Sequence, residues 1–461
     1  MDRKSIRRTT PLTAALALAF VLAACSTTPA EEDNTAQPTD TASPTAQDTG
    51  DETSDSSGQD TEATGGTLSV VTRWASGSPE AEAQQRIFDA FTAATGIALE
   101  VTEGLETIDD QVETMVAGNK APDLVIVNLF DKTLGWYEAR VTVDAQPYLT
   151  EWGLAETMKE DALNEWRVGG EPDGALQGLP YSGFSWPVWY NTDLLEKAGV
   201  EGIPTTTDEL IAAAEKLRAA DIDPVVVGGN DWTGQKLFYQ IAQSTTDASA
   251  MKDVMQNGGY CDTASVMDGI QLFTDLRDAG VFVDNVAGLT ADDMYAMYYS
   301  EQAAIMSAGS WAYAGAVDAG TGVEERTTLG GFALPSGSVF DKPSSLQGFT
   351  GVGFMITEQG AAPDRIDLVR QLVQAFYETQ NVGDFVKTAS ILPPVTGDFA
   401  SYATNPLLAE ALGLDSEVSY AVMPDVWIGS ASDPIIAVLA GAYGSASPDE
   451  ICSGLDSATQ S

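Results

Sequence analysis

The fold is decided by the stretch Thr67-Leu-Ser-Val-Val-Thr-Arg-Trp74 and by the residues that follow it as far as Val127. Its apolar part, Leu68 to Thr72, predicts a short strand. A helix is expected next: Ser78-Pro79 caps its start, Ile87, Phe88, Phe91 and Ala94 have helical spacing, and Gly96 ends it. Ile97, Leu99 and Val101 then alternate as a strand. A second helix through Val112 to Val116 ends at Gly118, and Leu124 to Val127 form a buried strand. Strand, helix, strand, helix, strand predicts a parallel α/β sheet.

The same pattern starts again about sixty residues later. Val188 to Asn191 is the end of a strand, Thr206 and Glu209 form a capping box for a helix through Leu217, and Pro224 to Val227 is another strand. The chain therefore contains two α/β units. Two such units usually hold a ligand in the crevice at the carboxyl ends of their strands.

Length and charge exclude several classes of function. The chain has 461 residues, 22 basic and 68 acidic, with no histidine and a formal net charge of −46. Two or three domains are expected at this length. The absence of histidine excludes Ser-His-Asp and Cys-His catalysis and imidazole metal sites. The acidic excess argues against nucleic acid, whose phosphates need Lys and Arg to neutralise them.

The first 24 residues have the pattern of a secretory signal. Four basic residues (Arg3, Lys4, Arg7, Arg8) precede the mostly apolar segment Pro11 to Val21, and Leu22-Ala-Ala-Cys25 follows it. This string resembles the bacterial lipobox, in which cleavage precedes the cysteine and its thiol carries a diacylglycerol. An ordinary signal with a chance cysteine is the alternative. We expect Cys25 to be lipidated and to anchor the protein.

Residues 25–66 form a low-complexity acidic segment. After Cys25 it contains no Leu, Ile, Val, Phe or Lys, so it cannot bury enough apolar surface to offset its chain entropy. It is interpreted as a disordered tether between the anchor and the folded part. A poorly ordered N-terminus without a role is the alternative.

The order of segments from residue 68 onward resembles the sugar-binding extracellular solute-binding proteins of ABC importers, the family that includes maltose-binding protein. The resemblance covers nearly the whole expected fold. It rests on nine strings taken in order: Leu68–Trp74, Phe88–Ile97, Gly118–Val125, Gly178–Tyr181, Val188–Leu195, Gly199-Val200 with Pro204, Gly309–Tyr313, Gly331–Pro335 and Gly348–Ile356, the last leading to a helix from Asp364 to Tyr377. Each string is weak alone, and the ligand loops match no single sugar specificity.

The resemblance implies an α/β fold of the type II periplasmic-binding-protein class, with two lobes that close on a ligand. Three hinge crossings are expected near Tyr181 to Ser185, Leu334 to Ser336 and Leu392 to Thr396. Lobe one would comprise residues 67–180 and 337–391, and lobe two residues 186–333 and 397–461. A ligand would shift the open–closed equilibrium by contacting both lobes only when they are closed.

A sugar site needs flat aromatic platforms with carboxylates, amides and backbone groups around them. We expect four of the nine tryptophans to serve as platforms: Trp74 after the first strand, Trp186 at the first crossing, Trp232 in a loop after a strand, and Trp311, whose position contributes a stacking tryptophan in the family. Core packing is the alternative for each. The remaining tryptophans are expected to pack, namely Trp136, Trp152, Trp166 and Trp189, while Trp427 could reach the cleft.

Several polar residues are candidates to hydrogen-bond the hydroxyls of a sugar. Glu103 follows the second strand, Asn230 and Asp231 precede Trp232, and Asp131 matches a family position that hydrogen-bonds sugar hydroxyls. Ionised carboxylates accept strong hydrogen bonds from hydroxyls, although a solvated acid is the alternative for each.

Gly348 and Phe349 begin a Gly-x-x-Gly-x-Gly run. Its spacing does not fit a dinucleotide loop, and no helix follows directly. A close approach of the backbone near the cleft is the better interpretation, and we include both residues in the predicted ligand site.

Cys261 and Cys452 are the two cysteines outside the signal region. Thiols oxidise outside the cell, so a disulfide between them is favoured over two free buried thiols. Two cysteines without a histidine give no zinc site, and the sequence predicts no metal and no cofactor.

Three functions remain in competition. The first is a lipid-anchored, monomeric receptor on the outer face of the cell membrane that captures a sugar or oligosaccharide and delivers it to the permease subunits of an ABC transporter. The second is a carbohydrate-active enzyme, although the chain has no nucleophile elbow, phosphate loop or metal-ligand cluster. The third is a surface adhesin, and a receptor for another polar solute is a variant of the first.

Overall fold

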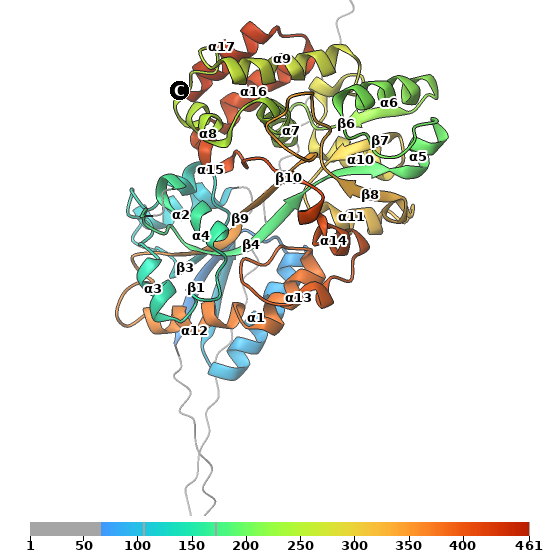
Figure 1. Cartoon of the computed structure of the whole chain (residues 1–461). Helices are drawn as coiled ribbons and strands as arrows, with labels where there is room; N and C mark the ends of the chain where they lie inside the picture. The colour runs from blue at the N-terminus through green and yellow to red at the C-terminus, as the bar shows by residue number, and fades with distance from the viewer. Residues whose placement is uncertain (1–65, 105–106, 171–172, 461) are drawn as a thin grey trace, which may run out of the picture. The chain divides into compact units, whose positions relative to one another are not determined.

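Two β-sheets form the framework of the protein in the computed structural model, which describes residues 66–104, 107–170 and 173–460 (Figure 1). The predicted signal peptide (1–24), the predicted lipidation site Cys25 and residues 26–65 of the predicted tether lie outside the described residues. The fold described below is that of residues 66–460 with the gaps just given.

The first sheet has six strands in the order β10-β9-β3-β1-β2, with β4 also paired to β9. The central strands β1, β2 and β3 are parallel, whereas β9 runs antiparallel to both β3 and β4. Their bounds are β1 Thr67–Thr72, β2 Ala98–Glu103, β3 Leu124–Val127, β4 Leu179–Trp186, β9 Ser344–Ile356 and β10 Ser419–Tyr420. The parallel β1–β3 core confirms the strand, helix, strand pattern predicted from residues 67–127.

The second sheet has four strands in the order β6-β7-β5-β8. The strands β6 and β7 are parallel, and β5 runs antiparallel to both β7 and β8. Their bounds are β5 Val188–Asn191, β6 Asp223–Val226, β7 Ala303–Ser307 and β8 Thr327–Gly330.

Helices surround the two sheets in two groups (Figure 1). Lobe one is defined here as β1–β3 with the helices α1 Pro79–Thr95, α2 Ile108–Ala117, α3 Gln146–Glu151, α4 Glu160–Glu165, α12 Ile366–Phe376 and α13 Thr379–Ala389. Lobe two is β5–β8 with α5 Thr192–Lys197, α6 Thr207–Ala219, α7 Trp232–Ala242, α8 Ala248–Asn257, α9 Ala264–Asp278, α10 Ala291–Tyr299, α11 Ala312–Asp318, α14 Pro406–Ala411, α16 Ser432–Gly444 and α17 Pro448–Thr459. The short helix α15 (Asp425–Ile428) precedes α16.

The helix ends follow the capping residues that the sequence indicated. Ser78 caps α1 by accepting a hydrogen bond from the Ala81 N–H at 3.1 Å, and Gly96 ends that helix with a φ of 71°, which suits a residue without a Cβ. Thr206 and Glu209 form the predicted capping box of α6.

Two long strands, β4 and β9, connect the lobes (Figure 1). The start of β9 contacts lobe two, because the Ser344 carbonyl accepts a hydrogen bond from Gln240 Nε2 at 2.6 Å. Just before β9, the Val339 N–H donates to the Ser244 carbonyl at 2.9 Å. The further end of β9 pairs with β3 in lobe one. The residue at which each lobe begins and ends stays a prediction.

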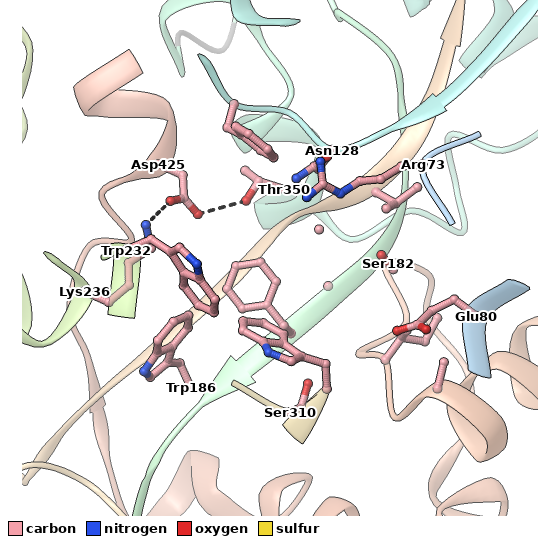
Figure 2. Close-up of a pocket in the computed structure, with 18 of the residues that line it drawn as sticks. Arg73, Glu80, Asn128, Ser182, Trp186, Trp232, Lys236, Ser310, Thr350 and Asp425 are labelled. Atoms are coloured by element: carbon pink, nitrogen blue, oxygen red, sulfur yellow. Dashed lines mark hydrogen bonds and ion pairs between the residues drawn. The ribbon is translucent and has the colours of Figure 1, made fainter. Parts of the chain in front are cut away.

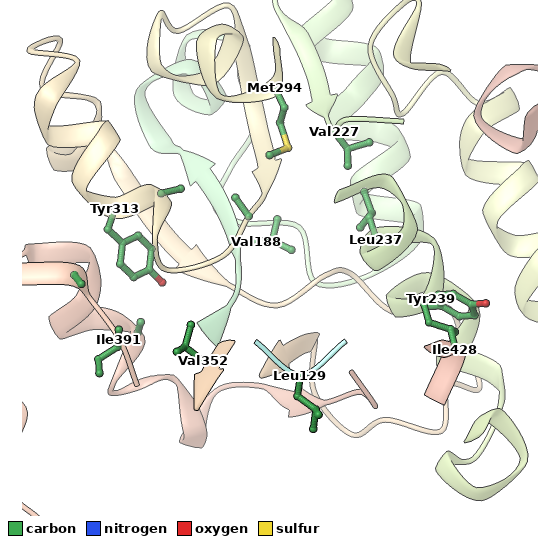
Figure 3. Packing of buried hydrophobic residues seen from close by; sticks show 14 of the residues in the cluster. Leu129, Val188, Val227, Leu237, Tyr239, Met294, Tyr313, Val352, Ile391 and Ile428 are labelled. Carbon is green, nitrogen blue, oxygen red and sulfur yellow. The ribbon is translucent and has the colours of Figure 1, made fainter. Parts of the chain in front are cut away.

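Apolar side chains from both lobes and from the connecting strands form one large buried cluster. Figure 3 shows part of it, with Val188 on β5, Val352 on β9 and Leu237 on α7. All three side chains are buried. The strands that link the lobes are therefore held by the same packing that holds the sheets.

A disulfide joins Cys261 to Cys452, with the two Cα atoms 5.1 Å apart. It links the loop after α8 to α17, across 191 positions of the chain. The disulfide favoured from the sequence is thus confirmed.

Within the described residues, one stretch, Asp425–Gly444, is long and apolar enough to cross a membrane by length and composition alone. It is not one continuous helix, because α15 ends at Ile428 and a 3-10 turn, Gly429–Ala431, precedes α16. Buried side chains such as Ile435 and Leu439 hold α16 against the rest of the protein. Packing within the protein buries about a third of this stretch.

Candidate functional site

A cavity of about 650 Å³ lies between the lobes and is lined by residues of both (Figure 2). Lobe one contributes Arg73, Trp74, Glu80 and Asn128, the connecting strands contribute Ser182, Phe184, Trp186 and Thr350, and lobe two contributes Trp232, Lys236, Ser310 and Trp311. The volume falls within the usual range for a small-molecule site.

The cavity forms where parallel strands end. Arg73 and Trp74 follow β1 directly, Asn128 follows β3, and Ser310 and Trp311 follow β7 by a few residues. Carboxyl ends of parallel strands in both sheets therefore open onto the same space, which is where ligands bind in open α/β folds.

Four aromatic rings gather on the lobe two side of the cavity, and we call Phe184, Trp186, Trp232 and Trp311 the cavity aromatic cluster. The Trp186 ring centroid lies 5.6 Å from that of Trp232 and 5.2 Å from that of Trp311, and the Trp232 and Trp311 centroids are 5.7 Å apart. Trp186 is only 1% exposed, whereas Trp232 is 37% exposed. Trp186 is thus buried by its neighbours and supports the other rings, whereas part of the Trp232 ring remains exposed.

Two hydrogen bonds and one glycine fix these rings. Trp186 Nε1 donates to Ser307 Oγ at 3.0 Å, and Trp311 Nε1 donates to the Tyr295 hydroxyl at 3.0 Å. The Trp311 ring lies against Gly309, where an added Cβ would come within 2.2 Å of it. These contacts hold Trp186 and Trp311 in place before any ligand binds, which lowers the entropy cost of binding.

Trp74 reaches the cavity from the opposite side but is 7% exposed. Its ring packs on Phe385 at 5.0 Å and on Tyr181 at 6.3 Å between centroids. All four tryptophans expected to contact ligand line the cavity, and Trp74 also serves the core, which was the alternative interpretation.

The tryptophans expected to pack do so: Trp136, Trp152, Trp166 and Trp189 are each at most 5% exposed. Trp427 is not among the cavity-lining residues. Its ring lies against Gly170 of the segment after α4, and Lys252 Nζ lies 4.3 Å from the ring centroid.

The structure does not bring Glu103, Asn230 and Asp231 to the cavity lining. Glu103 is exposed and accepts a hydrogen bond from the Ser76 N–H at 3.1 Å, and its bonds to Ser76 lower its pKa. Asp231 is the N-cap of α7, where its carboxylate accepts from Thr233 and from the Ala291 N–H. Asp231 is thus used to start the helix that carries Trp232.

Gly348 and Phe349 lie on β9 outside the cavity lining. The Phe349 side chain is 2% exposed, and its carbonyl accepts a hydrogen bond from Trp166 Nε1 at 2.7 Å. Gly348 permits a close approach, as expected, but the neighbour is the Phe184 ring, 2.8 Å from the position of an added Cβ. Asp131 begins a 3-10 turn after β3, and its side chain lies outside the described part of the structure.

The sequence alone did not single out Lys236 and Asp425, which form an ion pair in the cavity wall. Their side chains are 7% and 17% exposed, and they lie 189 positions apart in the chain. The only available signal was that Lys236 follows Trp232 by one helical turn. Arg73, Glu80 and Asp433 are the other charged residues of the lining, and Arg73 lies over the Phe130 ring.

Behind the cavity wall, Glu165 accepts a hydrogen bond from the Phe349 N–H at 2.6 Å. Burial raises the pKa of Glu165 to about 8, the Phe349 bond opposes this rise, and the nearby Asp425 carboxylate adds to it. No group of three or more Cys, Asp or Glu residues suited to a metal ion occurs within the described ranges.

Comparison with known proteins gives consistent matches. A family model described as bacterial extracellular solute-binding protein matches residues 75–382. The crystal structure of a probable secreted solute-binding lipoprotein of Streptomyces coelicolor is 36% identical, with a TM-score of 0.78, covering 86% of this chain and 98% of that one. A chitin oligosaccharide binding protein has the same fold at 22% identity and a TM-score of 0.69, covering 86% and 98%.

Matches among curated proteins are shorter. A Brucella abortus protein, described only as a binding protein, is 24% identical over 140 residues, which is 29% of this chain and 32% of that protein. The match therefore spans about a third of the length of that relative.

Proposed function

The chain belongs to the bacterial extracellular solute-binding protein family, and we propose that it is the lipid-anchored receptor of an ABC importer that captures a sugar or oligosaccharide. The two-lobe fold is the periplasmic-binding-protein fold shared with the Streptomyces coelicolor protein. In this proposal the lobes close around the ligand about the three crossing segments, and the closed protein delivers it as a monomer to the permease subunits.

The observation that carries the carbohydrate assignment is the exposed face of Trp232 within the cavity aromatic cluster. A sugar ring has an apolar face of C–H groups that packs on a flat indole, and hydroxyls around its edge that need polar partners. The cavity supplies both, because Ser310, Thr350 and Asn128 line it together with the tryptophans. The fold shared with a chitin oligosaccharide binding protein is in keeping with such a ligand.

A thermal-shift screen of the purified protein against neutral, acidic and amino saccharides tests this assignment, with tryptophan fluorescence as a second signal. A ligand at 100-fold its Kd stabilises the native state by about 2.7 kcal/mol. We expect a shift with one class of saccharide, recovered unchanged afterwards. A shift only with amino acids, polyamines or metal ions would overturn the carbohydrate assignment, and a cleaved saccharide would favour an enzyme.

Anchoring is tested separately. We expect labelled palmitate to enter the wild-type protein through Cys25 and to be absent from a Cys25→Ala variant, which should leave the membrane fraction. Ligand binding should be the same in both, because the cavity residues all lie beyond residue 70. Equal membrane retention of the variant would contradict the anchor.

A further inference from the structure

The helix α7 places Trp232 and Lys236 on the same face. They are four residues apart, so their Cβ atoms are neighbours one turn apart, and both side chains line the cavity. A ring that stacks on Trp232 therefore has its edge beside the Lys236 ammonium group.

Lys236 does not stand alone at this position. Its Nζ forms an ion pair with Asp425 Oδ1 and also donates to Gln235 Oε1 at 3.0 Å. The other carboxylate oxygen of Asp425 accepts a hydrogen bond from Thr350 Oγ1 at 3.2 Å (Figure 2). The pair thus joins α7 of lobe two to α15 and to the connecting strand β9.

Both groups line the cavity and have hydrogen-bonding capacity beyond the partners just named. An ammonium group has three N–H donors, and two of those of Lys236 have the partners just named. A carboxylate offers about four lone-pair positions, of which Lys236 and Thr350 occupy two. A ligand hydroxyl can accept from the ammonium and donate to the carboxylate at the same time.

The charge of the pair restricts what can bind beside it. Lys236 and Asp425 neutralise each other in a wall where their side chains are largely buried. An anionic ligand group would compete with Asp425 for Lys236 and leave a buried carboxylate without its partner, and a cationic group would do the reverse. The other charged lining residues, Arg73, Glu80 and Asp433, add no excess of positive charge.

We propose that Lys236 and Asp425 form a hydroxyl-binding subsite beside Trp232 that selects uncharged polyhydroxylated ligands over uronates and amino sugars. This inference rests on the proposed carbohydrate-binding function. It assigns the pair a direct contact with ligand, rather than a purely structural role in holding α7, α15 and β9 together.

The double variant Lys236→Met/Asp425→Leu separates the two roles. Replacing a buried ion pair with apolar residues of similar size is often neutral or stabilising, whereas a single replacement leaves one buried charge unpaired. We expect the double variant to melt within about 3 °C of the wild type. We also expect it to bind neutral ligand about 10-fold to 100-fold more weakly, the range for lost hydrogen bonds to charged groups. The matched control is Asp367→Leu/Arg370→Met, an exposed pair on α12.

Affinities are measured by calorimetry with maltotriose, xylotriose, cellotriose and mannotriose as neutral probes, trigalacturonate as the acidic probe and a glucosamine trimer as the cationic probe. The proposal predicts that the wild type and the control bind a neutral probe at least tenfold more tightly than either charged probe. A double variant that binds the neutral probe as tightly as the wild type would show that the pair is only structural. Tighter binding of a charged probe by the wild type would overturn the ligand class while leaving carbohydrate binding intact. No binding of any saccharide would overturn the proposed function itself, and this subsite with it.

Discussion

Two aromatic clusters of similar composition differ in how far their rings are exposed. The core aromatic cluster consists of Trp74, Tyr181, Phe354, Phe376 and Phe385, and none of these residues is more than 7% exposed. Its ring centroids lie 4.9 to 6.3 Å apart. The cavity aromatic cluster has similar spacings, yet Trp232 within it is 37% exposed. Aromatic spacing alone therefore does not distinguish a binding platform from a core.

Position within the secondary structure separates Trp232 and Trp311 from the three phenylalanines of the core aromatic cluster. Phe354, Phe376 and Phe385 lie inside β9, α12 and α13, where neighbouring elements cover them. Trp232 is the first residue of α7, and Trp311 immediately precedes α11. Residues at the start of a helix after a strand lie at the cavity edge of the sheet, so their rings stay accessible.

The largest effect expected from this comparison is on stability. Phe376→Ala removes a ring at the centre of the core aromatic cluster and should lower the free energy of unfolding by about 3–5 kcal/mol. Ligand affinity should not change under conditions where the variant is folded, because Phe376 does not line the cavity. Urea denaturation and calorimetry measure the two quantities, with Phe376→Leu as the milder control. A loss below 1 kcal/mol would mean that the core cluster is not a stabilising unit.

The opposite profile is expected for Trp232→Ala. Removing the exposed ring should weaken saccharide binding by at least about tenfold, since aromatic residues in cavities are frequent hot spots. The free energy of unfolding should change by less than about 1 kcal/mol, because the side chain is partly exposed. If Trp232→Ala bound saccharide as tightly as the wild type, the cavity aromatic cluster would not be a binding platform distinct from the core aromatic cluster.

An intermediate profile is expected for Trp186→Phe. The variant loses the Trp186 Nε1 hydrogen bond to Ser307 Oγ, so that the buried hydroxyl no longer has this donor. This loss should lower the free energy of unfolding by about 1–3 kcal/mol. Affinity should fall only a few-fold, because Trp186 supports Trp232 and Trp311 without an exposed face of its own. Ser307→Ala, which removes the same bond from the other side, should reproduce part of the stability loss while leaving affinity closer to that of the wild type.

A further effect on stability depends on pH and concerns Glu165, which lies behind the cavity wall. Its pKa is about 8 in the folded protein against an ordinary value of 4.5, so the folded state holds an extra proton between these values. The Glu165 contribution to the free energy of unfolding therefore falls as pH rises from about 4.5 to about 8, and is constant above that. Glu165→Gln removes this dependence, so the melting temperature of the variant relative to the wild type should rise between pH 5 and pH 8.5. A pH-independent difference between the two proteins would contradict the raised pKa.

Much of the fold was predictable from local signals. Ser78, Gly96 and the Thr206–Glu209 box mark helix ends through interactions within a few residues, so their chemistry is visible in the sequence. The same holds for the strand ends that placed Trp74, Trp232 and Trp311 at the cavity.

The polar part of the site was less accessible to sequence reasoning. Asp231 precedes Trp232 but is used as a helix cap, because a carboxylate at that position satisfies the free N–H groups of α7. Asp425 lines the cavity and pairs with Lys236, which lies 189 positions earlier in the chain. Pairings of this kind depend on how the two lobes and α15 come together, which no local pattern records.

A crystal structure of the protein with the saccharide that gives the largest thermal shift tests the central claim most directly. The account predicts one sugar ring stacked on the exposed face of Trp232, with a hydroxyl within hydrogen-bonding distance of both Lys236 Nζ and an Asp425 carboxylate oxygen. A saccharide bound away from Trp232, or one whose hydroxyls contact neither Lys236 nor Asp425, would contradict it.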